Sequence, residues 1–139
     1  MLLKLPSAFF SGVRLRSINE QEAIVSVPYK WFSQNPFRST YFACQAMAAE
    51  MSTGVLALGH IYKRNPQVSM LVTGLQAEFV KKATERVYFA CSDGEVFRQA
   101  IEDAVSSGQG KTLTATSIGC TAAGDVVSSF KIEWSFKAK

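Results

Sequence analysis

Between Thr40 and Ile61 the chain reads TYFACQAMAAEMSTGVLALGHI, a run that is rich in Ala, Met and Leu and free of proline. This composition favours a helix, for which Ser39 or Thr40 could serve as the N-cap. Gly59 and the polar run Lys63–Pro66 predict its end. Because the run is apolar on nearly every side, we expect the helix to be buried by a sheet, or shared between a sheet and a partner chain.

Strands are predicted on both sides of this helix. Alternation from Val13 to Arg16 and the apolar run Ala23–Val27 flank a polar turn and predict a hairpin, and Trp31–Arg38 reads as a loop. After the helix, the largely apolar run Val68–Val80 is typical of a central strand covered on both faces, with Arg86–Cys91 as its antiparallel neighbour.

The last third of the chain predicts a short helix and two strands. A capping box at Ser92–Glu95 and an apolar face that ends at Gly108 indicate an amphipathic helix. Lys111–Thr121 and Val126–Lys137 flank a turn, and apolar and polar residues alternate in the second segment. The element order predicts an α+β fold in which an antiparallel sheet of about six strands wraps the long helix.

The composition indicates one packed domain that covers residues 1–139, with 47% hydrophobic and 19% charged residues. A net charge of +4 with scattered basic residues favours a small anionic ligand and carries no nucleic-acid motif. The opening MLLKLPSAFFSG is broken by Pro6, unlike a secretory signal, and Glu50 interrupts the best candidate for a membrane span. We therefore expect neither nucleic acid nor a membrane as partner.

The three cysteines, Cys44, Cys91 and Cys120, are widely separated and form no CxxC pair. With a single histidine in the chain, they predict neither a metal site nor a disulfide framework. They suit a reducing compartment, so we expect a cytoplasmic protein. No cofactor is indicated.

The stretch from Asn35 to Glu50, NPFRSTYFACQAMAAE, resembles the loop asparagine and helix carboxylate of phenylacetate-degradation-type acyl-CoA thioesterases in the hotdog superfamily. The run LQAEFVKKA from Leu75 to Ala83 is similar to the end of their third strand. The resemblance implies a curved antiparallel sheet around one central helix, and homodimers or homotetramers. Where some relatives have His-Gly-Gly this chain has Tyr41, Phe42 and Ala43, so it looks nearer to a branch that lacks the histidine.

Glu50 is the only formal charge between Thr40 and Ile61, and an unpaired buried carboxylate is disfavoured unless it has a role. It could be the base that activates water against a thioester carbonyl, a nucleophile, or a structural carboxyl that is hydrogen-bonded or protonated. The free N–H groups near Phe42 and Ala43 could stabilise the oxyanion. They precede Glu50 by about 10–12 Å along the helix, so we expect a site shared by two chains.

Further candidates are less specific. Asn35 could bind the carbonyl or the water, or be an ordinary loop residue, and Thr53 could orient the water or bond a backbone carbonyl. Lys81, Lys82 and Arg86 could bind the phosphates of coenzyme A, or be solvated turn charges. The predicted substrate-binding residues are therefore Tyr41, Phe42 and Ala43 at the helix start, together with Lys81, Lys82 and Arg86.

Cys44 and His60 lie about 24 Å apart on one helix, too far for a thiol–histidine pair. The sequence thus predicts hydrolysis of an acyl thioester, with a non-catalytic acyl-CoA or fatty-acyl binding protein as the alternative.

Overall fold

The computed structural model describes residues 3–139. In chain order the elements are α1 (Pro6–Phe10), β1 (Arg14–Ile18), β2 (Ala23–Val27), the 3-10 helix η1 (Trp31–Ser33), α2 (Phe42–Ile61), β3 (Val68–Phe79), β4 (Val87–Cys91), α3 (Gly94–Ser107), β5 (Lys111–Cys120) and β6 (Val126–Ala138).

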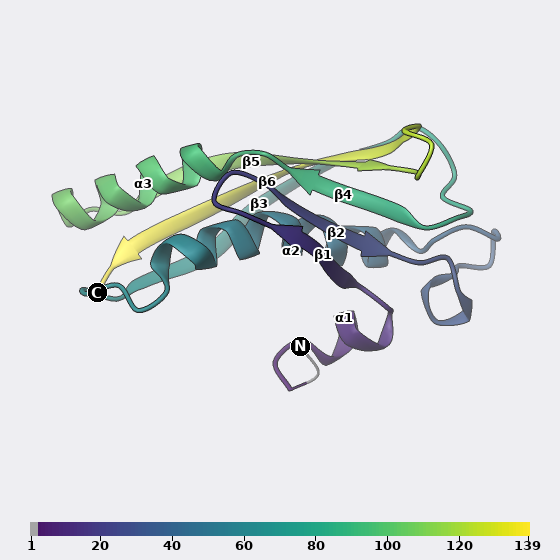
Figure 1. Ribbon diagram of the computed structural model, residues 1–139, viewed down its shortest axis with the longest axis horizontal. Helices are drawn as coiled ribbons and strands as arrows, with labels where there is room; N and C mark the ends of the chain where they lie inside the picture. The colour runs from purple at the N-terminus through teal and green to yellow at the C-terminus, as the bar shows by residue number, and fades with distance from the viewer. Residues whose placement is uncertain (1–2) are drawn as a thin grey trace.

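The six strands form one antiparallel sheet in the order β1-β2-β4-β5-β6-β3. The long helix α2 lies against one face of the sheet and contacts every strand except β3 closely, while α3 packs against α2, β5 and β6 (Figure 1). This architecture confirms the predicted α+β fold. No helix within residues 3–139 is long and apolar enough to cross a membrane.

The core lies between α2 and the sheet. In β6 the predicted alternation is confirmed, because Phe130, Ile132, Trp134 and Phe136 are at most 4% exposed. They pack toward the inner side of α2, which buries ten residues of the helix. This burial accounts for the apolar character of the α2 sequence.

Polar side chains also link α2 to the sheet. The three bonds are Ser52 Oγ to Ser117 Oγ at 2.7 Å, Ser128 Oγ to Gln45 Oε1 at 2.7 Å, and Trp134 Nε1 to Thr53 Oγ1 at 2.8 Å. All three are buried, and such bonds are costly to leave unmade. They fix how α2 is rotated on the sheet, and therefore which of its residues face outward.

The position of β3 corrects the sequence prediction. β3 is an outer strand that pairs only with β6, and β4 pairs with β2 and β5 instead of β3. Several of its apolar side chains are exposed, among them Leu71, Leu75 and Phe79. The apolar run was therefore misread as a strand covered on both faces.

Both helix starts also differ from expectation. Neither Ser39 nor Thr40 caps α2, because the Ser39 hydroxyl donates to Asn35 and the Thr40 hydroxyl donates to the Ala83 carbonyl. Tyr41 is the N-cap and makes no side-chain cap bond.

The capping box predicted at Ser92–Glu95 is wrong, because Asp93 is the N-cap of α3 and makes no side-chain cap bond, while the Ser92 hydroxyl donates to Glu22. The Asp93 carboxylate accepts the N–H of Thr116 on β5.

Two smaller corrections concern helix extents. α2 continues through Gly59 to Ile61. The short helix α1, with Pro6 in its first turn, was not predicted, because five residues are too few to show a helical period.

Candidate active site

Five of the predicted site residues line two separate pockets along α2, whereas Tyr41, Ala43, Thr53 and Arg86 line neither. The first, the start pocket, has a volume of about 400 Å³ and is lined by Asn35, Ser39, Thr40, Phe42, Gln45, Phe79, Val80, Lys81, Lys82 and Ala83. The second, the mid-helix pocket, has a volume of about 260 Å³ and is lined by Lys4, Leu5, Pro6, Ser7, Ala8, Met47, Glu50 and Met51.

Glu50 lies in the mid-helix pocket, between α1 and the middle of α2. Its carboxylate makes no hydrogen bond or ion pair with any residue from 3 to 139, and Lys4 lines the same pocket without pairing with it. Burial raises the pKa of the Glu50 carboxyl above its ordinary value, as expected for a charge that loses water without gaining a partner. A carboxylate in this state is a better proton acceptor than a fully solvated one.

Gly54 leaves open space beside this carboxylate. It follows Glu50 by one helical turn, and a Cβ added there would lie 3.6 Å from Glu50 Oε1 and 3.4 Å from Cζ2 of Trp134. The Glu50 carboxylate is thus flanked by α1 on one side and by the Gly54 backbone on the other.

Thr53 is buried next to Glu50 but is committed to other partners. Its hydroxyl donates to the Glu50 carbonyl oxygen at 2.8 Å and accepts the Trp134 Nε1–H at 2.8 Å. The one hydroxyl hydrogen is therefore already used, and only the second lone pair of Oγ1 is left to accept a further hydrogen bond.

The start of α2 presents unpaired N–H groups. Within residues 3–139 the N–H groups of Phe42 and Ala43 have no acceptor, whereas those of Cys44 and Gln45 donate to the Tyr41 carbonyl. Unpaired donors at a helix start carry the positive end of the helix dipole. These are the donors that the sequence predicts for an oxyanion.

Aromatic rings surround these N–H groups. Tyr41 and Phe42 contact edge to face at 5.1 Å between centroids, and Phe42 contacts Phe79 of β3 at 6.5 Å. Tyr41 and Phe42 are both exposed. The helix start is therefore an apolar surface with two polar donors in it.

Asn35 lines the start pocket but holds its own loop together. Its Oδ1 accepts the N–H groups of Phe37 at 2.9 Å and Ser39 at 3.2 Å, and its Nδ2 donates to Ser39 Oγ at 3.0 Å. One of the two Nδ2 hydrogens remains for a ligand.

The basic residues only partly converge. Lys81 and Lys82 line the start pocket, where Lys81 pairs with Asp125 at 3.5 Å and Lys82 Nζ donates to the Phe37 carbonyl at 3.4 Å. Arg86 is not among the residues that line this pocket.

Residues 1–135 match the protein family described as "Domain of unknown function (DUF4442)". The chain belongs to the DUF4442 family. No curated protein matches the sequence of this DUF4442 chain.

Solved structures resemble this DUF4442 chain over almost its whole length. One is a protein of unknown function from Pseudomonas aeruginosa, described as a probable thioesterase, with a TM-score of 0.86, 18% identity, and coverage of 99% of this chain and 91% of that chain. Another is a protein of unknown function from Chlorobaculum tepidum TLS, with a TM-score of 0.82, 14% identity, and coverage of 98% and 88%. At these identities the likeness shows the fold, which is the hotdog fold implied by the resemblance in sequence.

Gln45 is a polar residue of the start pocket that the sequence interpretation missed. It is 3% exposed and accepts the Ser128 hydroxyl hydrogen at 2.7 Å. An uncharged polar residue among Ala and Met gives little sequence signal, and its partner lies 83 residues away in the chain. The available signal was its spacing, three residues after Phe42 and so on the same side of the helix.

Cys44 and His60 lie near opposite ends of α2, as the sequence predicts. Burial raises the pKa of the Cys44 thiol, which suits a packing role.

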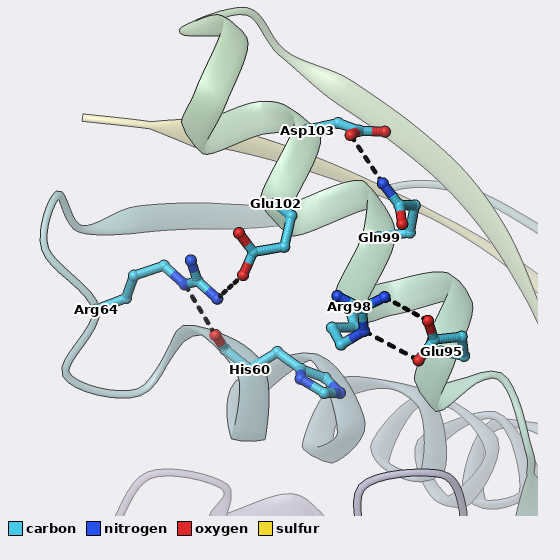
Figure 2. A network of polar contacts seen from close by, with 7 residues as sticks. All are labelled: His60, Arg64, Glu95, Arg98, Gln99, Glu102 and Asp103. Atoms are coloured by element: carbon cyan, nitrogen blue, oxygen red, sulfur yellow. Dashed lines mark hydrogen bonds and ion pairs between the residues drawn. The ribbon is translucent and has the colours of Figure 1, made fainter.

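Figure 2 shows the surroundings of His60: its carbonyl oxygen accepts a hydrogen bond from Arg64 Nε at 3.1 Å, and Arg64 forms an ion pair at 2.6 Å with Glu102 of α3. The imidazole makes no hydrogen bond within residues 3–139, so this network ties α2 to α3 through Arg64.

Proposed function

We propose that this protein hydrolyses an acyl thioester, with acyl-CoA as the favoured substrate, by means of water activated by Glu50. The observation that carries the proposal is the half-buried Glu50 carboxylate, which has no protein partner in the described chain and a pKa raised by burial. The description of the Pseudomonas aeruginosa neighbour as a probable thioesterase supports the same reaction class.

The chemistry divides between a base and an oxyanion site. Ionised Glu50 takes a proton from water as the water oxygen attacks the thioester carbonyl carbon. The carbonyl oxygen then carries negative charge, which the N–H groups of Phe42 and Ala43 stabilise. When the C–S bond breaks, the proton held by Glu50 passes to the departing thiolate, and the products are a carboxylic acid and a thiol.

The proposed site is shared between two chains. Glu50 and Phe42 line different pockets, and the N–H groups of Phe42 and Ala43 are about 10–12 Å from Glu50 along α2. A water molecule between base and oxyanion must contact both at about 3 Å. A second copy that places its start pocket against the mid-helix pocket of the first supplies the missing group, and by two-fold symmetry the same arrangement forms twice.

The outer strand β3 is the proposed meeting edge. It is twelve residues long, its outer backbone groups have no strand partner in the described chain, and it exposes Leu71, Leu75 and Phe79. Long apolar edges pair readily with another strand. Phe79 also lines the start pocket, so pairing along β3 brings the second copy next to the site. We propose a homodimer, which two such dimers could extend to a tetramer.

The substrate class follows from the rims of the start pocket. Lys81 and Lys82 are cations that suit phosphate groups, while Tyr41 and Phe42 offer apolar surface for an acyl or pantetheine chain. We propose Arg86, which lies nearby in the chain, as a further phosphate contact in the dimer. With free cysteines at Cys44, Cys91 and Cys120, a cytoplasmic location fits this substrate.

The test is thiol release from a panel of acyl-CoAs of different chain length. Glu50→Gln is expected to lower kcat at least 100-fold, because it removes the base while keeping the size of the side chain. Glu102→Gln, which changes a carboxylate on α3 far from both pockets, is the matched control and should keep full activity. If no substrate in the panel is hydrolysed faster by the wild type than by Glu50→Gln, the proposal is wrong.

A second candidate is binding of an acyl ligand without hydrolysis. It is favoured by the bulky side chains of Tyr41 and Phe42 at the helix start, where close backbone approach to a carbonyl is easiest with small residues. Native mass spectrometry of gently purified protein distinguishes the two. An acyl ligand that stays bound equally in the wild type and in Glu50→Gln, and is never turned over, supports this candidate.

A further inference from the structure

Gln45 shares with Thr40 the lowest exposed fraction, 3%, among the polar residues that line the start pocket. Its Oε1 is occupied by the Ser128 hydroxyl, whereas Nε2 donates to no acceptor within residues 3–139. Every fully enclosed side-chain nitrogen or oxygen in that range has a partner. The small exposed area of Gln45 therefore includes Nε2, which is the atom that opens on the pocket.

Ser128 determines this orientation. Its side chain is fully buried on β6 and donates to Oε1 at 2.7 Å, so the amide nitrogen is turned away from the sheet. The neighbouring residue Val127 accepts the backbone N–H groups of Val80 and Lys81, which belong to the pocket wall. The same segment of β6 thus fixes both the wall of the pocket and the donor inside it.

The hydrogen-bond donors at this pocket suit a ligand that carries an acceptor oxygen. Gln45 follows Phe42 by three residues, so its side chain lies on the same side of α2 as the Phe42 ring and leans toward the helix start. Among the described residues that line the pocket there is no carboxylate, and the charged ones are Lys81 and Lys82. A neutral carbonyl oxygen fits a buried amide N–H, while phosphates fit the exposed lysines.

We propose that Gln45 Nε2 donates a hydrogen bond to the thioester carbonyl oxygen of the substrate, and that Ser128 is the positioning residue that holds the amide in this orientation. This inference rests on the proposed function. It adds a substrate contact from the side of α2 to the backbone donors at the helix start.

Two CoA analogues that cannot be hydrolysed isolate this contact. One is a ketone in which CH₂ replaces the thioester sulfur, so the carbonyl oxygen is kept. The other is the S-alkyl-CoA thioether of the same chain length, which lacks that oxygen. The wild type is expected to bind the ketone more tightly than the thioether, and the Gln45 bond should account for about five- to tenfold of that preference, the usual size of one well-placed hydrogen bond.

Three variants make the comparison specific. Gln45→Met keeps the size of the side chain and removes the donor, so it should lower the ketone preference about five- to tenfold and leave only the part due to the backbone N–H groups of Phe42 and Ala43. Ser128→Ala keeps the donor but frees its orientation, and should reduce the preference partly. Ser117→Ala is the matched control, because it removes an equally short buried bond between the sheet and α2, to Ser52, away from the pocket. It should leave the preference unchanged.

The outcomes separate this inference from the proposed function. A decrease of the ketone preference by about five- to tenfold in Gln45→Met and an unchanged preference in Ser117→Ala support the inference. If the wild type prefers the ketone and Gln45→Met keeps that preference undiminished, or if Ser117→Ala lowers it equally, Gln45 is not the contact and the proposed hydrolysis stands. If the wild type binds neither analogue, both are overturned. Should Gln45→Met not fold, an unchanged preference in Ser128→Ala overturns the positioning role and with it the inference.

Discussion

The two pockets along α2 are chemically complementary. The start pocket offers N–H donors and cations, and none of the described residues that line it is a carboxylate. The mid-helix pocket holds Glu50 among mostly apolar side chains. Each contains part of what thioester hydrolysis requires, and neither contains both parts. Under the proposed function each chain alone is therefore incomplete, and the predictions below test whether the two pockets act together.

The largest effect is expected from preventing the chains from pairing. Leu71→Lys combined with Leu75→Lys places two charges on the exposed surface of β3, where a partner strand must bury them. The double variant should be monomeric by light scattering and should lose nearly all thioesterase activity, by about 1,000-fold or more, since each site then lacks one half. Thr114→Lys on the inner strand β5 is the control and should keep both properties. A fully active monomer contradicts the shared site.

The next effect isolates one backbone donor. Phe42 is the first residue of α2, where proline is tolerated and its missing N–H breaks no helical bond. Phe42→Pro and Phe42→Ala both remove the ring, but only Phe42→Pro removes the N–H. We expect kcat of Phe42→Pro to be about 100-fold below that of Phe42→Ala. Equal kcat values for the two variants would exclude this N–H as an oxyanion donor.

A smaller effect probes the space beside Glu50. Gly54→Ala should raise the free energy of unfolding by about 0.5–1 kcal/mol, because alanine favours the helix interior, and its methyl group meets only ordinary contacts at 3.4 and 3.6 Å. The same methyl would lie in van der Waals contact with Glu50 Oε1 at 3.6 Å and occupy space that a water molecule beside the carboxylate needs, so kcat should fall several-fold. Gly59→Ala, which meets nothing within 4 Å, should give a similar gain in stability at unchanged kcat. Denaturant unfolding and kinetics of both variants check this, and full activity of Gly54→Ala would exclude a tight fit around the carboxylate.

The smallest effect is a pH dependence of stability. Burial raises the pKa of Glu50 in the folded chain, so the folded state binds more protons than the unfolded state between roughly 4.3, the ordinary glutamate value, and the raised pKa. The contribution of Glu50 to the free energy of unfolding is fully present below that pH window and is lost as the pH rises through it. Glu50→Gln should therefore be more stable than the wild type at neutral pH, with a difference that vanishes below about pH 4.3. Melting curves across this range check the sign; a stability difference that grows on acidification contradicts it.

Hydrolysis should follow the opposite trend with pH. The base must be ionised, so kcat/KM should fall as the pH is lowered through the raised pKa of Glu50. The measurement is the pH–rate profile of the wild type and of Glu50→Gln. If the decrease of kcat/KM at low pH occurs in the wild type and is absent from the residual activity of Glu50→Gln, it is assigned to Glu50.

Local sequence patterns were sufficient for most of the elements. The alternation in β6 and the apolar run of α2 predict elements that the structure contains, since both patterns follow directly from burial. Strand order was not accessible in the same way. β3 is apolar on both faces although it is an outer strand, and proximity in the chain wrongly suggested β4 as its neighbour.

The candidate site was only partly visible in the sequence. Glu50 was chosen because one charge in an apolar helix is conspicuous; its carboxylate has no partner among the described residues, and its catalytic role stays a prediction. Thr53 and Asn35 were chosen by spacing, which says nothing about their bonds to Trp134 and Ser39. Gln45 depends on Ser128 across the sheet, a contact that only the folded chain reveals.

Mixing two inactive variants tests the shared site most directly. Glu50→Gln removes the proposed base, and Phe42→Pro removes a proposed oxyanion donor. A mixed dimer therefore has one site with both groups intact and one site with both groups missing. After subunit exchange at equal concentrations, about one quarter of all sites are intact, and thiol release should recover to about a quarter of the wild-type rate. If the chains exchange and the mixture stays as inactive as its components, the base and the oxyanion donors do not come from different subunits.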